Sequence, residues 1–445
     1  MSPQCIAVIG AGISGLACAW LLARTHRVTL YAADDYLGGH THTVDVTLDG
    51  VTHPVDTGFL VFNDRTYPNL IALFEALGVA TAPSEMSFSV RLPDADVEWA
   101  GTSLAALFAQ PANLLRPRFW GMLADLLRFN REATALARDG RSLGRSLDTT
   151  LGVFLEQRGY GTAFRDWYLL PMCGAIWSCP TRSMADFPVD TLIHFCHNHG
   201  LLQVSGRPPW RTVTGGAREY VQRLAAALPD VRTATPVTRL TRADDGVTVT
   251  TGAGAERYDQ AVLACHSDQA LALLADAAPA EREVLAAVPY QSNRAVLHTD
   301  RSFLPARPRA WAAWNYHAEA GGAGMAVSYL INRLQPLPFT TPVIVTLNPE
   351  REPAPGTVMG AFDYTHPLFD ARAIAAQGQL GAIQGVRRTW FCGAWTGYGF
   401  HEDGLKSGMA VAAALGCPAP WARTAAAPAP GRTDVPLGGL AGAKP

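Results

Sequence analysis

The chain has 445 residues, of which 48% are apolar and 17% charged, so a disordered, collagen-like or coiled-coil protein is excluded. Its 36 basic and 38 acidic side chains give a formal net charge of −2, and without a basic excess we expect no nucleic acid partner. At ~150 residues per domain, the length predicts two or three domains.

The eight cysteines are scattered and none forms a C-x-x-C pair, which predicts free thiols and a cytoplasmic location. The apolar run at residues 5–23 is interrupted by three glycines and follows no basic residue, so we do not expect a signal peptide. No uncharged apolar run elsewhere is long enough for a membrane-spanning helix.

The first predicted elements are a buried parallel strand, a glycine-rich turn, a helix and a second strand. Their expected bounds are residues 5–9, 10–15, 16–24 and 27–31. This order is the context that a dinucleotide-binding G-x-G-x-x-G motif requires, so we predict a dinucleotide site here.

Each glycine of the motif has its own predicted role. Gly10 allows a tight turn, Gly12 lets the backbone approach a pyrophosphate, and Gly15 lets the helix pack closely on the sheet. The N-terminus of the following helix then presents free N–H groups and the positive end of the helix dipole, which favour an anion.

An acidic residue that binds the adenosine ribose is expected about 20 residues further on. Ala32 stands at the end of the second strand, where such an acid is usual. Asp34 either reaches the ribose from the following loop or is a solvated turn residue, and the sequence leaves both open.

The remaining elements are predicted from apolar periodicity and from turn residues. In chain order they are a hairpin at 44–55 around Asp49-Gly50, a helix at 67–77, a helical region at 83–209, a hairpin at 237–250 around Asp245-Gly246, a buried strand at 258–264, a mixed region at 269–385, a strand at 389–392 and a helix at 404–415.

Residues 31–40, Y-A-A-D-D-Y-L-G-G-H, resemble a fingerprint of the flavin-containing amine oxidase superfamily, which includes monoamine oxidases, protoporphyrinogen oxidase and carotenoid desaturases. Gly38 and Gly39 match this fingerprint, and His40 stands where many members have an arginine near the pyrophosphate. The run from His40 through Thr41 to Thr43 resembles one bacterial branch of predicted FAD-binding proteins, whose genes often neighbour cyclopropane-fatty-acid-synthase-like methyltransferases.

Three further stretches support the resemblance. Residues 56–59 resemble the segment beneath the flavin ring, residues 214–217 resemble a Gly-Gly helix start, and residues 390–408 resemble the C-terminal FAD motif, whose helix dipole would face the flavin. The cofactor-binding residues that the resemblance implies are Gly10, Gly12, Ile13, Ser14, Gly15, Asp34, Gly38, Gly39, His40, Thr41, Gly58, Phe59, Val237, Gly393, Ala394, Gly404 and Leu405.

The resemblance implies an α/β fold with a Rossmann-like FAD-binding domain and an inserted α+β substrate domain. The FAD-binding domain would comprise residues 1–82, 210–268 and 386–417, and the substrate domain residues 83–209 and 269–385. Residues 418–445 are rich in Ala, Pro and Gly and are expected to form a disordered tail.

The function that this resemblance implies is an FAD-dependent oxidoreductase that transfers a hydride from an apolar, lipid- or fatty-acyl-like substrate to flavin N5. The alternatives are a flavin amine oxidase and a flavin-binding protein without turnover. Many amine oxidases of the superfamily hold a water between N5 and a substrate-domain lysine, but this chain has no lysine before Lys406. We therefore expect poor turnover of simple primary amines.

The candidate catalytic residues lie between the last strand and the last helix. Tyr398 is one of several aromatic residues in a region where the superfamily places an aromatic side chain against the flavin. His401 and Glu402 are the titratable groups nearest to the predicted flavin edge and are the acid–base candidates.

Two other patterns have both a structural and a functional interpretation. Residues 171–177 and 200–203 either pack in a core or line an apolar substrate cavity. The cluster of His194, Cys196, His197 and His199 lacks the spacing of known metal sites, and no metal is expected.

Residues 118–131 predict an amphipathic helix with a basic character. Its wide apolar face comprises Phe119, Met122, Leu123, Leu126 and Leu127. The helix either packs in the substrate domain or lies on an anionic bilayer, where it would admit a lipid to the cavity.

Overall fold

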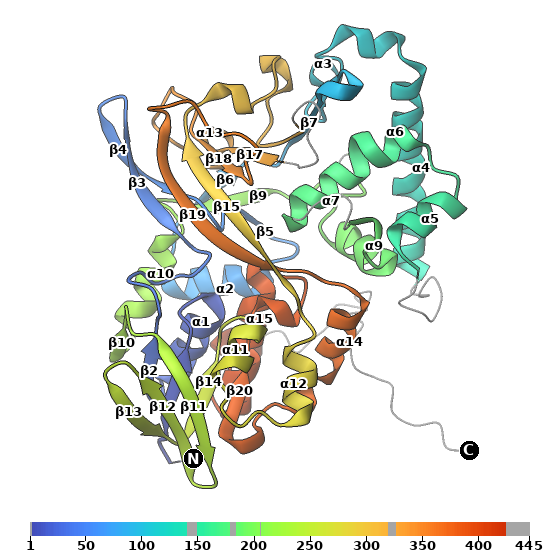
Figure 1. Ribbon diagram of the computed structural model, residues 1–445. Helices are drawn as coiled ribbons and strands as arrows, with labels where there is room; N and C mark the ends of the chain where they lie inside the picture. Colours follow the sequence, from blue (N-terminus) through green and yellow to red (C-terminus); the bar gives the residue numbers. More distant parts are fainter. Residues whose placement is uncertain (1, 140–148, 179–183, 205, 319–325, 424–445) are drawn as a thin grey trace, which may run out of the picture.

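The computed structural model describes residues 2–139, 149–178, 184–204, 206–318 and 326–423. Figure 1 shows two parts, a lower one with the parallel sheet and an upper one with a large, mainly antiparallel sheet beside a group of helices. The predicted mixed α/β class is confirmed.

The lower part is centred on a five-stranded parallel sheet with the order β10-β2-β1-β14-β20. The strands are β10 (Asp230–Arg232), β2 (Arg27–Tyr31), β1 (Cys5–Ile9), β14 (Gln260–Leu263) and β20 (Thr389–Phe391). The predicted strands at 5–9 and 27–31 are confirmed with the same bounds. The strand expected at 258–264 is divided, because Asp259 turns the chain by bonding to the backbone of Cys5.

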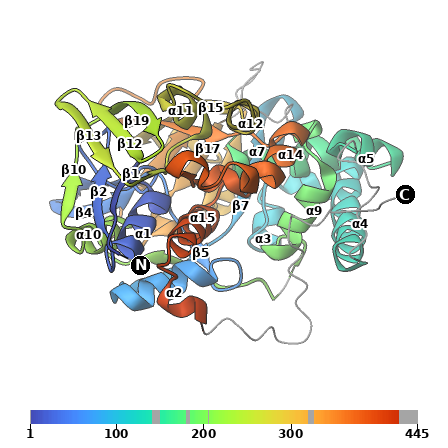
Figure 2. The same ribbon diagram turned by 90° about the horizontal axis from the view of Figure 1, so that it is seen from below.

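Helices α1 (Ile13–Leu22) and α15 (His401–Ala414) pack together beside this sheet (Figure 2). A Cβ on Gly408 would lie 2.3 Å from the Ser14 carbonyl oxygen, so glycine permits this close contact. Helices α2 (Pro68–Leu77) and α10 (Arg218–Ala226) complete the layer. An antiparallel sheet of β11 (Val237–Ala243), β12 (Gly246–Thr251) and β13 (Gly254–Tyr258) also contacts the parallel sheet.

The upper sheet has seven strands in the order β19-β15-β18-β17-β16-β7-β8. Its strands are β19 (Val358–Pro367), β15 (Tyr290–His298), β18 (Ile344–Leu347), β17 (Ala326–Leu330), β16 (Trp314–His317), β7 (Phe88–Leu92) and β8 (Val97–Ala100). The helices beside it are α3 (Leu104–Leu107), α4 (Pro117–Asp139), α5 (Leu151–Gln157), α6 (Thr162–Phe164), α7 (Leu170–Trp177) and α9 (Val189–Asn198).

Shorter elements connect the two parts. The predicted hairpin is confirmed as β3 (Thr43–Leu48) and β4 (Val51–Asp56), with positive φ at Asp49 and Gly50 as a tight Asp-Gly turn requires. The other elements are β5 (Phe62–Asn63), β6 (Thr81–Ser84), β9 (Trp210–Val213), α11 (Ser267–Leu273), α12 (Pro279–Leu285), α13 (Ile331–Leu334) and α14 (Ala371–Gln379).

The C-terminal prediction is wrong over residues 418–423. Pro420–Arg423 form a short 3-10 turn, where Trp421 stacks on Trp20 at 6.3 Å between ring centroids and donates a hydrogen bond to Asn69. The apolar contact outweighs the Ala/Pro-rich composition there, and residues 424–445 lie outside the described part of the chain. No helix in the described ranges combines the length and apolar character needed to span a bilayer.

Candidate functional site

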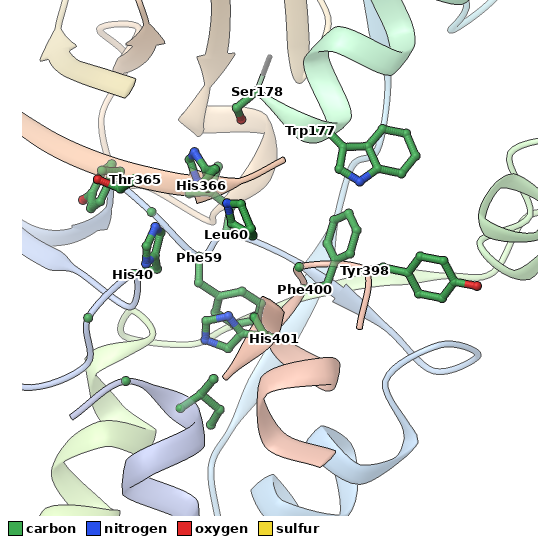
Figure 3. Close-up of a pocket in the computed structure, with 18 of the residues that line it drawn as sticks. His40, Phe59, Leu60, Trp177, Ser178, Thr365, His366, Tyr398, Phe400 and His401 are labelled. Carbon is green, nitrogen blue, oxygen red and sulfur yellow. The ribbon is translucent and has the colours of Figure 1, made fainter. Parts of the chain in front are cut away.

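A cavity of about 1370 Å³ lies between the two parts and is lined by residues from both. Pockets for a single small molecule usually measure ~300–1,000 Å³. This cavity therefore has room for a dinucleotide and a second molecule together. Figure 3 shows the region in which residues of the lower part meet those of the substrate side.

One end of the cavity is formed by the glycine-rich turn, where Gly10, Gly12, Ile13 and Ser14 all line the wall. A Cβ on Gly12 would meet no atom within 4 Å, so the backbone there borders open space. No side chain caps α1 and its first turn holds no acidic residue, which leaves its N–H groups free for an anion. This arrangement fits a pyrophosphate.

Gly15 has a purely structural role at this turn. Its Cβ would lie 1.9 Å from the Gly10 carbonyl oxygen, which no side chain tolerates. Gly38 and Gly39 line the cavity next to this turn, and both have positive φ. The backbone of Gly38 forms an isolated β-bridge with that of Gly12.

Beyond the glycine-rich turn, the same end of the cavity is lined by Ala32, Asp34, Thr235 and Val237. The Asp34 carbonyl oxygen accepts a hydrogen bond from the backbone of Ala234 at 2.7 Å. Its side chain is exposed and Asp34 lines the cavity, so a contact with a ribose stays one of the two predicted alternatives. Val237 begins the neighbouring hairpin and borders the same space.

His40, Gly58 and Phe59 form the middle of the wall. A Cβ on Gly58 would lie 2.1 Å from the His40 carbonyl oxygen, and this oxygen accepts a hydrogen bond from the Phe59 backbone at 2.8 Å. Burial lowers the pKa of His40 well below its usual range, so the ring is neutral. Among the described residues, its buried Nε2 atom has no hydrogen-bond partner.

Thr41 is turned away from the cavity. Its hydroxyl contacts the Tyr220 hydroxyl and lies 2.8 Å from Nε2 of His401. Thr41 therefore holds the wall residue His401 in place and does not itself line the cavity.

Some residues of the C-terminal motif line the cavity, and others pack in the core. Gly393 and Ala394 line the cavity, whereas Leu405 is fully buried in the core. A Cβ on Gly404 would lie 3.0 Å from both Ile13 Cγ2 and Ser14 Oγ, so this glycine lets α15 support the glycine-rich turn. Gly404 and Leu405 thus act through packing, not by contact with a ligand.

The N-terminus of the last helix differs from the prediction in its start. The helix begins at His401, three residues earlier than predicted, and its first turn carries Glu402 and Asp403. The Asp403 carboxylate accepts hydrogen bonds from the backbones of Tyr398 and Phe400, each at 3.1 Å. This carboxylate already compensates the helix dipole.

The acid–base prediction for Glu402 is wrong. Its carboxylate accepts hydrogen bonds from the Asn69 backbone at 3.1 Å, the Asn69 amide at 2.7 Å and the Leu70 backbone at 3.0 Å. Glu402 therefore caps the N-terminus of α2 and does not line the cavity.

His401 lines the cavity as an aromatic surface. Its ring stacks on Phe59 at 3.7 Å, and its Nε2 atom is engaged with Thr41 and Tyr220. Burial lowers its pKa to about 3, so it is neutral at physiological pH and unsuited to the predicted acid–base role.

Tyr398 borders the cavity, but its ring and hydroxyl point away from His401 and Phe59 (Figure 3). Phe400 takes the place predicted for an aromatic contact, because it stacks on Phe195 at 5.0 Å and faces Trp177. Both Tyr398 and Phe400 border the cavity, and the aromatic contact with a flavin stays a prediction.

The substrate side of the cavity is walled by aromatic and aliphatic side chains. They include Trp99, Tyr168, Met172, Ala175, Ile176, Trp177, Leu201, Trp314, Tyr329 and Leu347. Members of both predicted segments, 171–177 and 200–203, are therefore at the wall. The charged Arg333 of this wall is paired with Glu85 at 2.7 Å.

No group of three or more His, Cys, Asp or Glu side chains in the described ranges is arranged to hold a metal ion. His199 lines the cavity, but His194 and His197 do not. None of the described cysteines forms a disulfide, and Cys179 lies outside the described residues.

The sequence profile described as flavin-containing amine oxidoreductase matches residues 13–340. The chain belongs to this family. The match begins at Ile13, inside the glycine-rich turn, and continues through most of the upper part of the structure, so the predicted resemblance to this family is confirmed.

One relative of this oxidoreductase is named for an enzyme of carotenoid synthesis. A carotenoid phi-ring synthase of Streptomyces griseus is 30% identical over 321 residues, which cover 68% of this chain and 59% of that protein. The chain therefore spans less than two thirds of that relative.

Solved structures share the fold of this oxidoreductase. Cyclohexylamine oxidase from Brevibacterium oxydans IH-35A superposes with a TM-score of 0.69 at 18% identity, covering 93% of this chain and 98% of that one. A CLA-producing fatty acid isomerase from P. acnes gives 0.63 at 16% identity, with coverage of 91% and 96%. At such identities, the likeness concerns the fold alone.

Several wall residues of this oxidoreductase lie outside the predicted motifs, above all Thr365 and His366 on β19. Figure 3 places both near His40 and Leu60. His366 follows no motif, and only its position at the end of a strand before Pro367 marked it in the sequence. Burial, with a contribution from His266, lowers its pKa to about 4.

Proposed function

We propose that the protein is an FAD-dependent oxidoreductase that dehydrogenates an apolar, lipid- or fatty-acyl-like substrate. The observation that carries the proposal is the continuous cavity, because one end fits a pyrophosphate and the other is walled by aromatic and aliphatic side chains. The carotenoid named for one relative is itself an apolar compound, which agrees with this substrate class. The two-part division of the chain into an FAD-binding and a substrate domain is part of the proposal.

The cofactor is proposed to be FAD, bound without a covalent link. The residues proposed to hold it are those that border the cavity from Gly10 to Val237 and at Gly393 and Ala394. When bound, the flavin supplies the hydride acceptor. Burial raises the pKa of the cavity-lining Cys265 to about 12, so its thiol stays protonated and is a poor nucleophile for a flavin linkage.

The test is to precipitate the purified protein with acid and to record the flavin spectrum of the supernatant. Release of FAD is the expected result. Flavin that remains with the pellet would show a covalent bond.

The protein's own contribution to the reaction is positioning and exclusion of water. Trp177, Phe400 and Tyr329 hold an apolar substrate, and His40 and His401 border the cavity as neutral rings. Such a wall gives a C–H donor a fixed orientation and keeps water from the reacting atoms.

Amine oxidation is the second candidate, because solved amine oxidases share the fold. Of the two lysines in the sequence, Lys406 is exposed on α15, and Lys444 lies outside the described residues. A lysine that orients a water in the cavity is therefore missing from its described wall.

Anaerobic mixing separates these functions. We expect bleaching of the flavin by an acyl or carotenoid substrate and none by benzylamine or a polyamine. Rapid peroxide formation from an amine would establish the amine oxidase, and no reduction by either class would favour a flavin-binding protein without turnover.

Peripheral contact with an anionic bilayer is proposed as the route by which substrate enters. The apolar face predicted for α4 is mostly internal, since Phe119 and Met122 are fully buried. Leu127 of the predicted face is exposed, and other exposed apolar side chains lie on α3, on α4 and on the 3-10 turn Pro111–Leu115. This exposed patch comprises Leu104, Leu114, Leu115, Trp120 and Leu127.

The charge and the position of this exposed patch support a membrane partner. Residues 104–131 carry four arginines, of which Arg116 is paired with Asp96 and Arg128 with Asp125, and the basic charge of Arg118 and Arg131 favours anionic lipid. Leu104 follows two residues after Thr102, which lines the cavity, so the patch adjoins a cavity wall.

Flotation with vesicles tests this contact. The wild type is expected to float with phosphatidylglycerol vesicles, and Leu115→Glu combined with Trp120→Glu is expected to abolish flotation. Val51→Glu on the β3–β4 hairpin is the matched control, because Val51 is also exposed but lies outside the patch. Equal flotation of all three proteins, or of none, would contradict the proposal.

A further inference from the structure

A chain of side-chain amides lies behind His366 on the cavity wall. Asn293, on the neighbouring strand β15, is 1% exposed and its amide nitrogen lies 2.7 Å from Nδ1 of His366. The carbonyl oxygen of the Asn293 side chain accepts a hydrogen bond from the Asn348 amide at 2.7 Å.

The backbone fixes the orientation of both amides. The Arg294 N–H donates to Oδ1 of Asn348 at 3.0 Å, so this oxygen is an acceptor and the Asn348 nitrogen must point to Asn293. The Asn293 nitrogen also donates to the Gln291 carbonyl at 3.2 Å. Neither amide can be reversed without opposing two donors or two acceptors.

This orientation determines the tautomer of His366. Because the Asn293 nitrogen is a donor, Nδ1 of His366 accepts, and the proton of the neutral ring is on Nε2. His366 lines the cavity, and no partner for its Nε2 is found among the described residues. The ring thus presents an N–H group to the cavity beside His40, whose centroid is 5.1 Å away.

We propose that His366 is a fixed hydrogen-bond donor to the molecules bound in the cavity, and that Asn293 and Asn348 are positioning residues that hold its tautomer. The matching ligand chemistry is a carbonyl or carboxylate oxygen, or an unprotonated ring nitrogen. Either the flavin or the polar head of a fatty-acyl-like substrate carries such a group. The substrate alternative rests on the proposed function, whereas the tautomer does not.

The tautomer is tested first, by NMR of protein labelled with ¹⁵N in its histidine rings. The His366 signals are assigned with His366→Gln. We expect a neutral ring protonated at Nε2 throughout the range in which the protein is folded near neutral pH. Protonation at Nδ1, or titration like that of a free imidazole, would overturn the proposal.

Two variants of Asn293 sharpen this test. Asn293→Asp replaces the donor by a carboxylate oxygen, so the His366 proton is expected to move to Nδ1. Asn293→Ala removes the donor without adding charge, and the Nε2 tautomer is expected to lose its dominance. Asn332→Asp is the matched control, because Asn332 bonds to the backbone of residues 339–343 and does not line the cavity. Unchanged His366 signals in both Asn293 variants would overturn the positioning role.

The identity of the acceptor is tested with His366→Leu and His366→Gln. Gln keeps an N–H near the position of Nε2, whereas Leu removes it. If the flavin is the acceptor, His366→Leu weakens FAD binding about tenfold and shifts the flavin absorption band, and His366→Gln restores both.

If the substrate is the acceptor, FAD binding and the spectrum stay unchanged and KM rises about tenfold in His366→Leu alone. No difference between His366→Leu and the wild type in any of these readouts would overturn the proposal. Failure of every substrate to reduce the flavin would contradict the proposed function, but it would leave the NMR and FAD-binding results interpretable.

Discussion

The two ends of the cavity are built in different ways. At the nucleotide end, Gly10, Gly12 and Ser14 belong to one turn, and the ligand contacts are offered by backbone N–H groups and by the space that glycine leaves. At the substrate end, Trp99, Trp177 and Trp314 come from three distant segments, and side chains alone form the wall. The nucleotide end therefore depends on local sequence, and the substrate end on the tertiary structure.

The largest expected effect separates ligand binding from folding at the nucleotide end. Gly12→Val should abolish FAD binding while the apoprotein remains folded, because the new side chain enters open space that the pyrophosphate requires. Flavin content and the melting temperature of the apoprotein measure the two effects.

Gly15→Val is expected to prevent folding instead, since its Cβ would overlap the Gly10 carbonyl. The control for Gly12→Val is Gly121→Val on α4. A Cβ on Gly121, like one on Gly12, would meet no atom within 4 Å, but Gly121 lies far from the turn in sequence. Wild-type FAD affinity in Gly12→Val would refute the assignment of the turn.

At the substrate end we expect a variant that lowers stability and leaves FAD binding nearly unchanged. Trp177→Ala should lower the free energy of unfolding by about 3 kcal/mol, because Trp177 packs on Phe187, Phe195 and Phe400. Its effect on FAD affinity should be small. Denaturant unfolding measures the stability, and FAD titration measures the affinity. A large loss of FAD affinity would show that the two ends of the cavity are not independent.

Buried histidines on the substrate side should contribute to acid sensitivity, because the pKa values of His199, His298 and His366 are each lowered to about 4. Burial is the main cause. Between pH 6.5 and pH 4 the unfolded chain holds more protons than the folded one, so these groups make the protein less stable as pH falls through that range.

His298→Gln isolates one of these groups, because Gln keeps a donor toward Thr346. The stability of the wild type relative to this variant should fall by about 2 kcal/mol from pH 6.5 to pH 4. His53→Gln on the β3–β4 hairpin is the control. Parallel pH profiles of the wild type and His298→Gln would disprove the assignment.

The smallest expected effect concerns Glu402. Glu402→Gln should cost about 1 kcal/mol of stability, since one of the two oxygens that cap α2 is replaced by an amide nitrogen. The rate of flavin reduction should not change. A slower reduction in a variant of unchanged stability would restore the catalytic role that the sequence suggested.

The sequence was informative where backbone geometry decides the structure. The glycine-rich turn, the first two strands and the hairpin at Asp49-Gly50 follow from residue types whose conformational preferences are strong and local. The family was recognisable for the same reason, because its motifs are formed largely by glycines near phosphates.

The sequence was misleading where a side chain has a choice of partners. Glu402 is near the cavity along the chain, but helix α15 directs its carboxylate to α2. The helix start at His401 likewise depends on Asp403, which captures two backbone N–H groups. His366 belongs to no motif, and its partner Asn293 is 73 residues away in the sequence, so their contact could not be predicted.

The parallel sheet has a consequence for the biosynthesis of the protein. Strand β1 holds residues 5–9, but its neighbour β14 begins at residue 260, and the sheet is complete only with β20 at 389–391. At ~5–20 residues per second, the ribosome needs on the order of tens of seconds to deliver these partners. The apolar strand β1 has one edge without its partner until β14 emerges, and β14 has one until β20 emerges, so the nascent chain is expected to depend on chaperones over this interval.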